Sequence, residues 1–192
     1  MQLDRRILHA ARVSFSSCGY SGTTLELVAS ACGTTRRSVT SRYVNRDGLL
    51  IAVAKMEFEQ MLSDISATTE HEAGPIDELK SVCRMVLARS LQPDQIGMFR
   101  VYIGEVVRLP QLSMMLIQTA DTIESRIEHI VRQLQAQGAF QKYSASSVAT
   151  TAMAIMAANP INRATFSGEV FRTDADIERY FAGAWEIFLL MA

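Results

Sequence analysis

The sequence predicts an all-α protein. Apolar residues recur at the helical spacing of three and four along nearly the whole 192-residue chain. No run alternates apolar and polar residues between hairpin dipeptides, the pattern typical of β-strands. Hydrophobic residues make up 48% of the chain and charged residues 20%, which excludes a disordered, collagen-like or low-complexity protein. A chain of this length can bury a core without the help of metals or disulfides.

The first expected helix covers residues 3–18. Ile7, Ala11 and Phe15 lie at i, i+4 and i+8 and form one apolar face. Gly19 follows at the position where glycine commonly ends a helix, because glycine adopts the left-handed conformation of the cap without steric cost.

Two short helices are expected next. The run Thr23–Glu26 offers a threonine cap with a glutamate three residues on, and the helix of about two turns that follows stops at Gly33. Thr34 and Thr35 offer another cap, for a third helix over residues 36–43.

Six further helices are expected in the rest of the chain. The stretch 66–74 is rich in small, polar and acidic residues and ends before Pro75, so it is the clearest loop. We therefore expect about nine helices in all, those after residue 45 lying at about 46–65, 76–91, 94–107, 110–137, 144–158 and 174–191.

The charges are distributed unevenly along the chain. Residues 1–55 carry eight Lys and Arg against three Asp and Glu, a net charge of +5, whereas residues 56–192 carry eleven against seventeen, a net charge of −6. A sign split of this kind is either ordinary surface variation or the mark of a small basic module that faces a polyanion. The larger acidic part would then stay away from that polyanion.

Cysteine usage and hydropathy indicate a soluble protein of a reducing cytoplasm. The three cysteines are spaced as neither a CxxC pair nor a zinc site. Charged residues begin at Asp4 and leave no apolar signal region, and no uncharged apolar run approaches the roughly 20 residues of a membrane helix. We expect no contact with a membrane.

The sequence gives no support to an enzyme. His9, His71 and His129 fall in three separate segments, and neither a nucleophile elbow nor a glycine-rich phosphate loop occurs. We expect no catalytic residue, no metal site and no cofactor.

Residues 25–43 have the arrangement of a helix-turn-helix, with a glycine turn between two short helices. Ala29 lets the helices approach each other, and Gly33 allows the positive φ of the turn. Val28 and Val39 fill the space between them. The second helix exposes three cations and three hydroxyls and no acid: Arg36, Arg37, Ser38, Thr40, Ser41 and Arg42.

Such a surface suits the major groove of DNA. Arginine can donate two hydrogen bonds to guanine, and hydroxyls can bond to phosphates or base edges. The alternative is a solvated basic helix on an unrelated bundle, because short helix-turn-helix patterns also occur by chance.

Two runs of sequence are similar to signatures of the TetR family of transcriptional regulators. Residues 19–33 resemble the second helix of the family, and residues 43–50 resemble the segment that leaves its third helix. The likeness runs without a gap from Ile7 to about Val53 and includes Phe15. It implies a DNA-binding domain over residues 1–47, followed by an effector-binding and dimerisation domain over residues 48–192.

By this resemblance, Thr23 or Thr24 bonds a DNA phosphate and Arg46 stands in the place of a phosphate-binding lysine. The chain departs from the family at Arg37, where glycine is common, and at Thr40, where a phosphate-contacting tyrosine is common. The operator therefore cannot be inferred from relatives. The expected DNA-contacting residues are Thr23, Thr24, Thr35, Arg36, Arg37, Ser38, Thr40, Ser41, Arg42, Tyr43 and Arg46.

The later part of the chain resembles the family more loosely. Residues 101–112 are similar to an E-x-x-R-x-P-x-L segment of one TetR group, and the likeness implies a ligand cavity walled by helices four to seven. Methionine suits an adaptable apolar pocket but is also a common core residue, and Glu105 with Arg108 is equally consistent with a structural pair. The candidate pocket residues are Met85, Arg89, Met98, Tyr102, Glu105, Met114, Gln118 and Met153.

The resemblance also implies a homodimer through the last two helices. The final helix has apolar residues on more than one side, which exceeds what one core contact needs, and the helix before it offers small residues for close approach. The expected interface residues are Ala152, Ile155, Met156, Tyr180, Phe181, Ala184, Trp185 and Phe188.

These features together predict a ligand-responsive regulator, usually a repressor in this family, that binds a palindromic double-stranded operator as a dimer and is released by a small, largely apolar effector. The alternative is a helical protein-interaction module whose basic end binds an acidic partner and which does not respond to a small molecule. The sequence does not decide whether the protein represses or activates transcription. It also leaves open which effector and which operator it binds.

Overall fold

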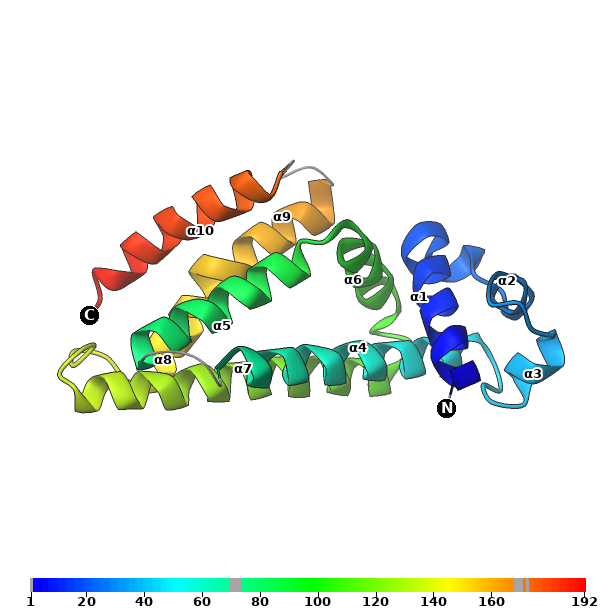
Figure 1. The fold of residues 1–192 in the computed structure, drawn as a ribbon, viewed down its shortest axis with the longest axis horizontal. Helices are drawn as coiled ribbons and strands as arrows, with labels where there is room; N and C mark the ends of the chain where they lie inside the picture. The colour runs from blue at the N-terminus through cyan, green and yellow to red at the C-terminus, as the bar shows by residue number, and fades with distance from the viewer. Residues whose placement is uncertain (1, 70–73, 168–170, 172) are drawn as a thin grey trace. The chain divides into compact units, whose positions relative to one another are not determined.

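The predicted all-α fold class is confirmed. The computed structural model describes residues 2–69, 74–167, 171 and 173–192, and these residues form helices and connecting turns with no strand among them. The helices are α1 (Gln2–Gly22), α2 (Leu25–Ala31), α3 (Arg36–Thr40), α4 (Arg46–Thr69), α5 (Pro75–Ser90), α6 (Pro93–Glu105), α7 (Pro110–Ala136), α8 (Ala145–Met153), the π-helix η1 (Ala154–Ala158), α9 (Asn159–Ser167) and α10 (Asp174–Leu189) (Figure 1).

Glycines mark two of the predicted helix ends. Gly19 leaves the helical conformation inside α1, with a φ of 70°, so the first straight helix ends where the sequence predicts. Gly33 has a φ of 64° in the turn between α2 and α3. Both angles lie in the left-handed region that glycine occupies without strain. The expected loop over 66–74 begins later than predicted, because α4 continues to Thr69, and residues 70–73 lie outside the described part of the chain.

The residues fall into two compact units. The first comprises residues 1–60 and 93–117, and the second comprises residues 61–92 and 118–192. The predicted division into 1–47 and 48–192 concerns the roles of the two parts and stays a prediction, whereas the compact units follow packing. The first unit joins the three N-terminal helices to the start of α4, to α6 and to the start of α7.

The first unit has one continuous apolar core. Its fully buried members come from every helix of the unit: Ile7, Ala11, Phe15, Val28, Val39, Leu49, Leu50, Val53, Ala54, Met98, Tyr102 and Leu112. Helix α6 packs closely on α1. The approach is so close that a Cβ atom placed on Gly97 would lie 2.5 Å from the backbone oxygen of Ser16.

The second unit is held by aromatic residues near its C-terminal helix. Phe188 lies between two rings, with centroid distances of 5.2 Å to Phe140 and 5.6 Å to Trp185. Ile177 and Phe181 complete the inward face of α10. Packing of this kind contributes beyond the area that it buries.

The helix predicted to end near residue 158 continues to Ser167. The N–H of Asn159 donates to the carbonyl of Ala154 in the wider π pattern, so the carbonyl of Ile155 would meet residue 160. That residue is Pro160, which has no N–H. The Tyr180 hydroxyl from α10 donates to the Ile155 carbonyl at 2.5 Å instead. Counted as one interrupted helix, α8, η1 and α9 bring the described helical segments to the nine predicted.

Candidate nucleic-acid interface

The N-terminal helices form a helix-turn-helix whose short helices have side-chain caps. The Thr24 hydroxyl accepts from the N–H of Leu27 at 3.1 Å and begins α2. The Thr35 hydroxyl accepts from the N–H of Ser38 at 3.2 Å and begins α3. Val39 is the one buried residue of α3, so the rest of this helix is available to solvent.

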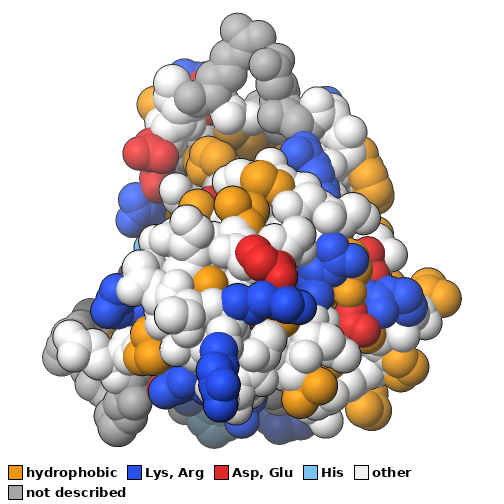
Figure 2. Space-filling view, turned by 90° about the vertical axis from the view of Figure 1, so that its right-hand side faces the viewer, with side chains coloured by type: hydrophobic (Ala, Val, Ile, Leu, Met, Phe, Trp, Pro, Cys, Tyr) orange, Lys and Arg blue, Asp and Glu red, His pale blue; other side chains and the backbone are white. Residues whose placement is uncertain are grey.

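Helix α3 ends at Thr40, earlier than the predicted residue 43, so the predicted cations lie on α3 and on the turn after it, and two of them have acidic neighbours. The Nε of Arg36 lies 2.6 Å from a carboxylate oxygen of Glu26 on α2. The Nε of Arg42 donates to Asp4 on α1 at 3.0 Å. Arg37 is exposed and has no acidic partner among the described residues. Figure 2 views the α2 and α3 end of the molecule, where several Lys and Arg side chains lie at the surface beside a few acidic ones.

The remaining predicted DNA-contacting residues differ in exposure. Thr35 and Ser41 are exposed, whereas Ser38, Thr40 and Tyr43 are half-buried. The hydroxyls of Thr40 and Ser41 donate to carbonyls one turn back in the chain, at 3.2 and 3.0 Å. These two hydroxyls can still accept hydrogen bonds from a ligand.

A shallow pocket of about 310 Å³ lies where α2 and α4 begin. Its lining includes Tyr20, Thr24 and Arg46. The Asn45 side chain accepts from the N–H of Gly48 at 2.9 Å and caps α4. The N-terminus of a long helix favours an anion, and the pocket therefore suits a phosphate.

The two threonines proposed for phosphate contact have different surroundings. Thr23 is fully buried, and its hydroxyl donates to the carbonyl of Gly19 at 2.8 Å. Thr24 is exposed and caps α2. Of the two, only Thr24 presents a hydroxyl to solvent. The predicted cap at Thr23 is wrong. The cap of α2 is Thr24, one residue later, so Glu26 is the second residue of the helix and not the third.

Arg46 has partners within its own unit. Its Nη1 donates to the carbonyls of Ser21 and Thr23, both at 3.1 Å, and its guanidinium lies 4.0 Å from the centre of the Tyr20 ring. The side chain therefore fixes the connection between α1 and α2, and its half-exposed positive charge lies in the same pocket as the carboxylate of Asp47.

Asp47, the second residue of α4, forms a close set of polar contacts. Both carboxylate oxygens accept from Arg108, at 2.7 and 2.9 Å, and one also accepts from the Tyr20 hydroxyl. The hydrogen bonds from Arg108 and then from Tyr20 lower the pKa of Asp47 to about 2. The Nε of Arg108 donates to Glu105 at 2.8 Å, which is the structural pair that the sequence left open as an alternative to a ligand anchor.

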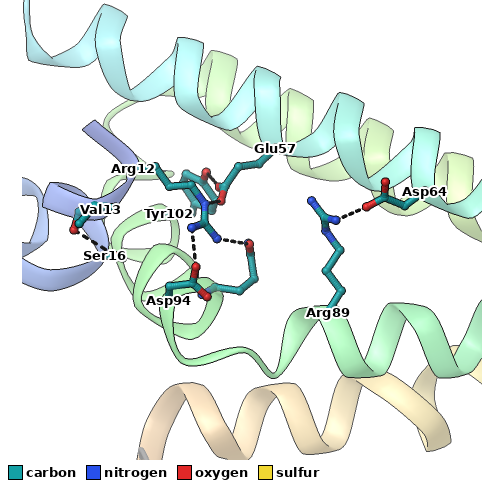
Figure 3. Close-up of polar contacts among 9 residues, drawn as sticks. Arg12, Val13, Ser16, Glu57, Asp64, Arg89, Asp94 and Tyr102 are labelled. Carbon is teal, nitrogen blue, oxygen red and sulfur yellow. Dashed lines mark hydrogen bonds and ion pairs between the residues drawn. The ribbon is translucent and has the colours of Figure 1, made fainter. Parts of the chain in front are cut away.

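A second polar cluster connects α1, α4 and α6 (Figure 3). The Arg12 guanidinium donates to Glu57 and to Asp94, both at 2.5 Å. Glu57 is 5% exposed and also accepts from the Tyr102 hydroxyl. Burial, and then the charge of Glu57, raise the pKa of Tyr102. Every buried polar atom of this cluster therefore has a partner.

The predicted pocket residues are divided between the two compact units, four in each. In the first unit, Met98 and Tyr102 are fully buried in the core and Met114 is 56% exposed. The polar groups of Tyr102 and Glu105 form hydrogen bonds within that unit, and their assignment as ligand anchors stays a prediction.

In the second unit the Arg89 guanidinium pairs with Asp64, as Figure 3 shows. Met85 and Met153 are half-buried, and Gln118 is exposed. These positions do not by themselves define a cavity, and a ligand role for them stays a prediction.

Most of the predicted dimer residues lie inside the second unit, and their role in a dimer stays a prediction. Six of the eight are already buried within the second unit: Ala152, Met156, Phe181, Ala184, Trp185 and Phe188. Ile155 and Tyr180 are half-buried, and the Tyr180 hydroxyl donates a hydrogen bond to the carbonyl of Ile155. A side chain that a single chain already buries has almost no surface to lose to a partner, so these residues form the core of the unit.

Sequence reasoning missed the acidic residues beside α3. Asp4 and Glu26 are distant in sequence from the arginines that they contact, and the expected cap gave Glu26 a different role. Only the packing of α1 and α2 against α3 brings each acid to its arginine. No spacing rule in the sequence gives that information.

The described residues contain neither a membrane-spanning helix nor a cluster of metal ligands. None of the described helices combines the length and the hydropathy needed to cross a lipid bilayer. Within the same part of the chain, His, Cys, Asp and Glu side chains do not gather in a group of three that could hold a metal ion.

Solved structures share this fold. A protein from Mesorhizobium loti assigned to the TetR family has a TM-score of 0.85 and 24% identity, with 98% of this chain and 96% of that chain covered. A fatty acid degradation regulator from Bacillus halodurans has a TM-score of 0.78 and 11% identity, covering 96% and 93%. A transcriptional regulator from Saccharomonospora viridis, solved in complex with choline, has a TM-score of 0.79 and 17% identity, covering 95% and 93%.

Family comparisons agree with the fold. A search of curated proteins found no match. Residues 7–53 match the profile of the bacterial regulatory proteins of the tetR family, and residues 77–191 match the C-terminal domain of AefR-like transcriptional repressors. The second match alone covers more than half of the chain. With a helix-turn-helix that exposes its basic helix, this chain belongs to the TetR family and is a DNA-binding transcriptional regulator, not an enzyme.

Proposed function

We propose that the chain is a repressor that binds a palindromic operator as a homodimer and leaves it when a small, largely apolar effector binds. The observation that carries the DNA-binding part is the exposed surface of α3 and of the turn after it, which presents Arg36, Arg37 and Arg42 on a capped helix-turn-helix. The match to a C-terminal domain described as that of a repressor supports the direction of regulation.

The pocket at the start of α4 supports a phosphate contact beside the recognition helix. Thr24 and Arg46 line it, and the helix N-terminus adds partial positive charge. With α3 in the major groove, such a contact would fix the register of the protein on the duplex, because phosphate contacts position and base contacts specify.

The dimer is proposed through apolar and small residues that the second unit leaves exposed. Helix α10 has an inward stripe, and opposite to it an exposed stripe of Gly183, Ile187 and Leu190 at i, i+4 and i+7. Ile187 is 59% exposed and Leu190 is 85% exposed. The neighbouring η1 exposes the small residues Ala154 and Ala158, which allow a close approach of helices. A two-fold pairing of this surface would present two copies of α3 to two half-sites.

The effector is proposed as apolar because methionines are numerous, ten in the chain. Two relatives bear names or ligands that differ in chemistry, a fatty acid degradation regulator and a complex with choline, so neither ligand is assigned to this chain. An effector that binds one state of the dimer better would shift the population away from the DNA-binding state.

The DNA-binding proposal is tested by fluorescence anisotropy with duplexes selected from a randomised library. Wild-type protein is expected to bind in a salt-dependent way, and Arg36→Ala with Arg37→Ala to weaken binding by about a hundredfold, from two lost charge and base contacts. The matched control replaces Arg132 and Arg179, two exposed arginines of the second unit, and is expected to bind as the wild type does. Equal binding by both double variants would contradict the proposal.

A further inference from the structure

An exposed acid lies beside the recognition helix. The Glu26 carboxylate on α2 contacts the Nε of Arg36 on α3 at 2.6 Å. The side chain of Arg36 is 66% exposed and that of Glu26 is 57% exposed, so the ion pair lies in the solvent on the surface proposed to meet DNA. Exposed pairs of this kind add little to stability, and the fold does not account for this one.

The geometry of the pair leaves one edge of the guanidinium available. Arginine has five N–H donors in a planar fork, and here the contact is made through Nε. The two Nη groups of Arg36 have no partner among the described residues. These are the groups that can donate together to O6 and N7 of a guanine.

The charge of Glu26 has a second effect. DNA carries a negative charge on every phosphate, and affinity without sequence preference comes from cations that neutralise them. A carboxylate held against a recognition-helix cation cancels part of that charge. This loss of binding affinity is the same at every DNA sequence. The affinity gained from an oriented guanidinium exists only at a sequence that has the matching base.

We propose that Glu26 is a positioning residue that determines specificity. It fixes the Arg36 guanidinium with its Nη edge toward a guanine, and it opposes binding to phosphates at sequences that lack this base. The inference rests on the proposed DNA binding through α3.

The pair formed by Arg42 and Asp4 provides a matched control. It is also an arginine–carboxylate ion pair, with Nε donating to Asp4 at 3.0 Å, and its side chains are less exposed, 36% and 40% against 66% and 57%. In Arg42, however, Nη1 also donates to the Ser38 carbonyl at 3.0 Å and to the Ser41 hydroxyl at 3.4 Å. This guanidinium is therefore bonded to α3 and to the turn that follows it, and removal of its acid should change charge without changing base preference.

The experiment measures sequence preference and salt dependence for the wild type, Glu26→Gln, Asp4→Asn and Arg36→Lys. Each protein is used in a selection from a randomised duplex library, and then titrated with the best wild-type duplex and with a scrambled one. Both acid-to-amide variants should bind the scrambled duplex more tightly, with a slope of log K against log salt steeper by about 0.9. Only Glu26→Gln should also lose about tenfold of its discrimination at one guanine position.

Arg36→Lys separates orientation from charge. Lysine keeps the charge but lacks the planar fork, so this variant should keep the wild-type salt slope and lose preference at the same base pair. Retained preference in Glu26→Gln, or an equal loss in Asp4→Asn, would overturn the role of Glu26 while leaving DNA binding intact. If the wild type enriches no sequence and shows no salt-dependent binding, the proposed function fails and this inference fails with it.

Discussion

At the scale of single residues, Asp47 makes stability depend on pH. Its pKa is about 2 in the folded protein against an ordinary value of 3.8, because Arg108 and Tyr20 donate to the carboxylate. The charged form is therefore favoured by folding. Its contribution is fully present above about pH 4 and is lost as the pH falls toward 2.

We expect Asp47→Asn to lower the melting temperature at pH 7. The gap between variant and wild type should stay constant down to about pH 4 and then close as wild-type Asp47 is protonated. Calorimetry across this range measures the gap. Glu59→Gln removes an exposed i,i+4 partner of Lys55 and provides the control, for which a small effect is expected. A gap that widened on acidification would contradict the assigned sign.

Single residues also show where sequence reasoning stops. The caps at Thr24 and Thr35 belong to threonine pairs that mark the helix starts, and the sequence located both starts to within a residue. Choosing between Thr23 and Thr24 needed the three-dimensional structure, because burial directs the first hydroxyl to Gly19. The pairing of Glu26 with Arg36 could not be predicted at all, since it depends on how α2 packs on α3.

At the scale of elements, the contact between α1 and α6 depends on a glycine. A Cβ at residue 97 would lie 2.5 Å from the Ser16 backbone oxygen, a distance that requires the helices to move apart. We expect Gly97→Ala to lower the free energy of unfolding by about 1–3 kcal/mol through overpacking, as measured by urea denaturation.

Gly104 provides a control in the same helix. A Cβ there would have no heavy atom within 4 Å, so Gly104→Ala should stay within about 0.5 kcal/mol of the wild type. Equal effects of the two substitutions would show that helix propensity, not the approach of α6 to α1, governs residue 97.

The periodicity of apolar residues predicted the positions of the helices well but not every helix end. The sequence predicts an end near residue 158, and the helix continues past Pro160 because the π pattern and the Tyr180 hydroxyl together satisfy the backbone. This compensation involves α10, which is distant in sequence. A local pattern therefore could not reveal it.

At the scale of the whole molecule, the sequence showed that α10 has apolar residues on more than one side but could not say which side is the core. The prediction places the aromatic residues of this helix in the dimer because apolar residues on more than one side exceed what one core contact needs. The structure uses Phe181, Trp185 and Phe188 within the chain. Fewer apolar residues of this helix are exposed, and the proposed pairing of two copies of the chain rests on them.

The dimer can therefore be tested at Ile187, which is 59% exposed on α10. In a two-fold dimer one substitution acts at both copies of the surface. Ile187→Glu removes an apolar contact and adds a charge at the interface, so we expect the dissociation constant of the dimer to rise at least about a hundredfold, measured by analytical ultracentrifugation. Ile103→Glu is the control, because Ile103 is 51% exposed on α6 and lies outside the proposed surface.

The Ile187 variant should also bind a palindromic duplex more weakly while binding a single half-site as the wild type does, since its α3 is unchanged. If the Ile187→Glu variant dissociated with the same constant as the wild type, the interface would lie elsewhere on the molecule.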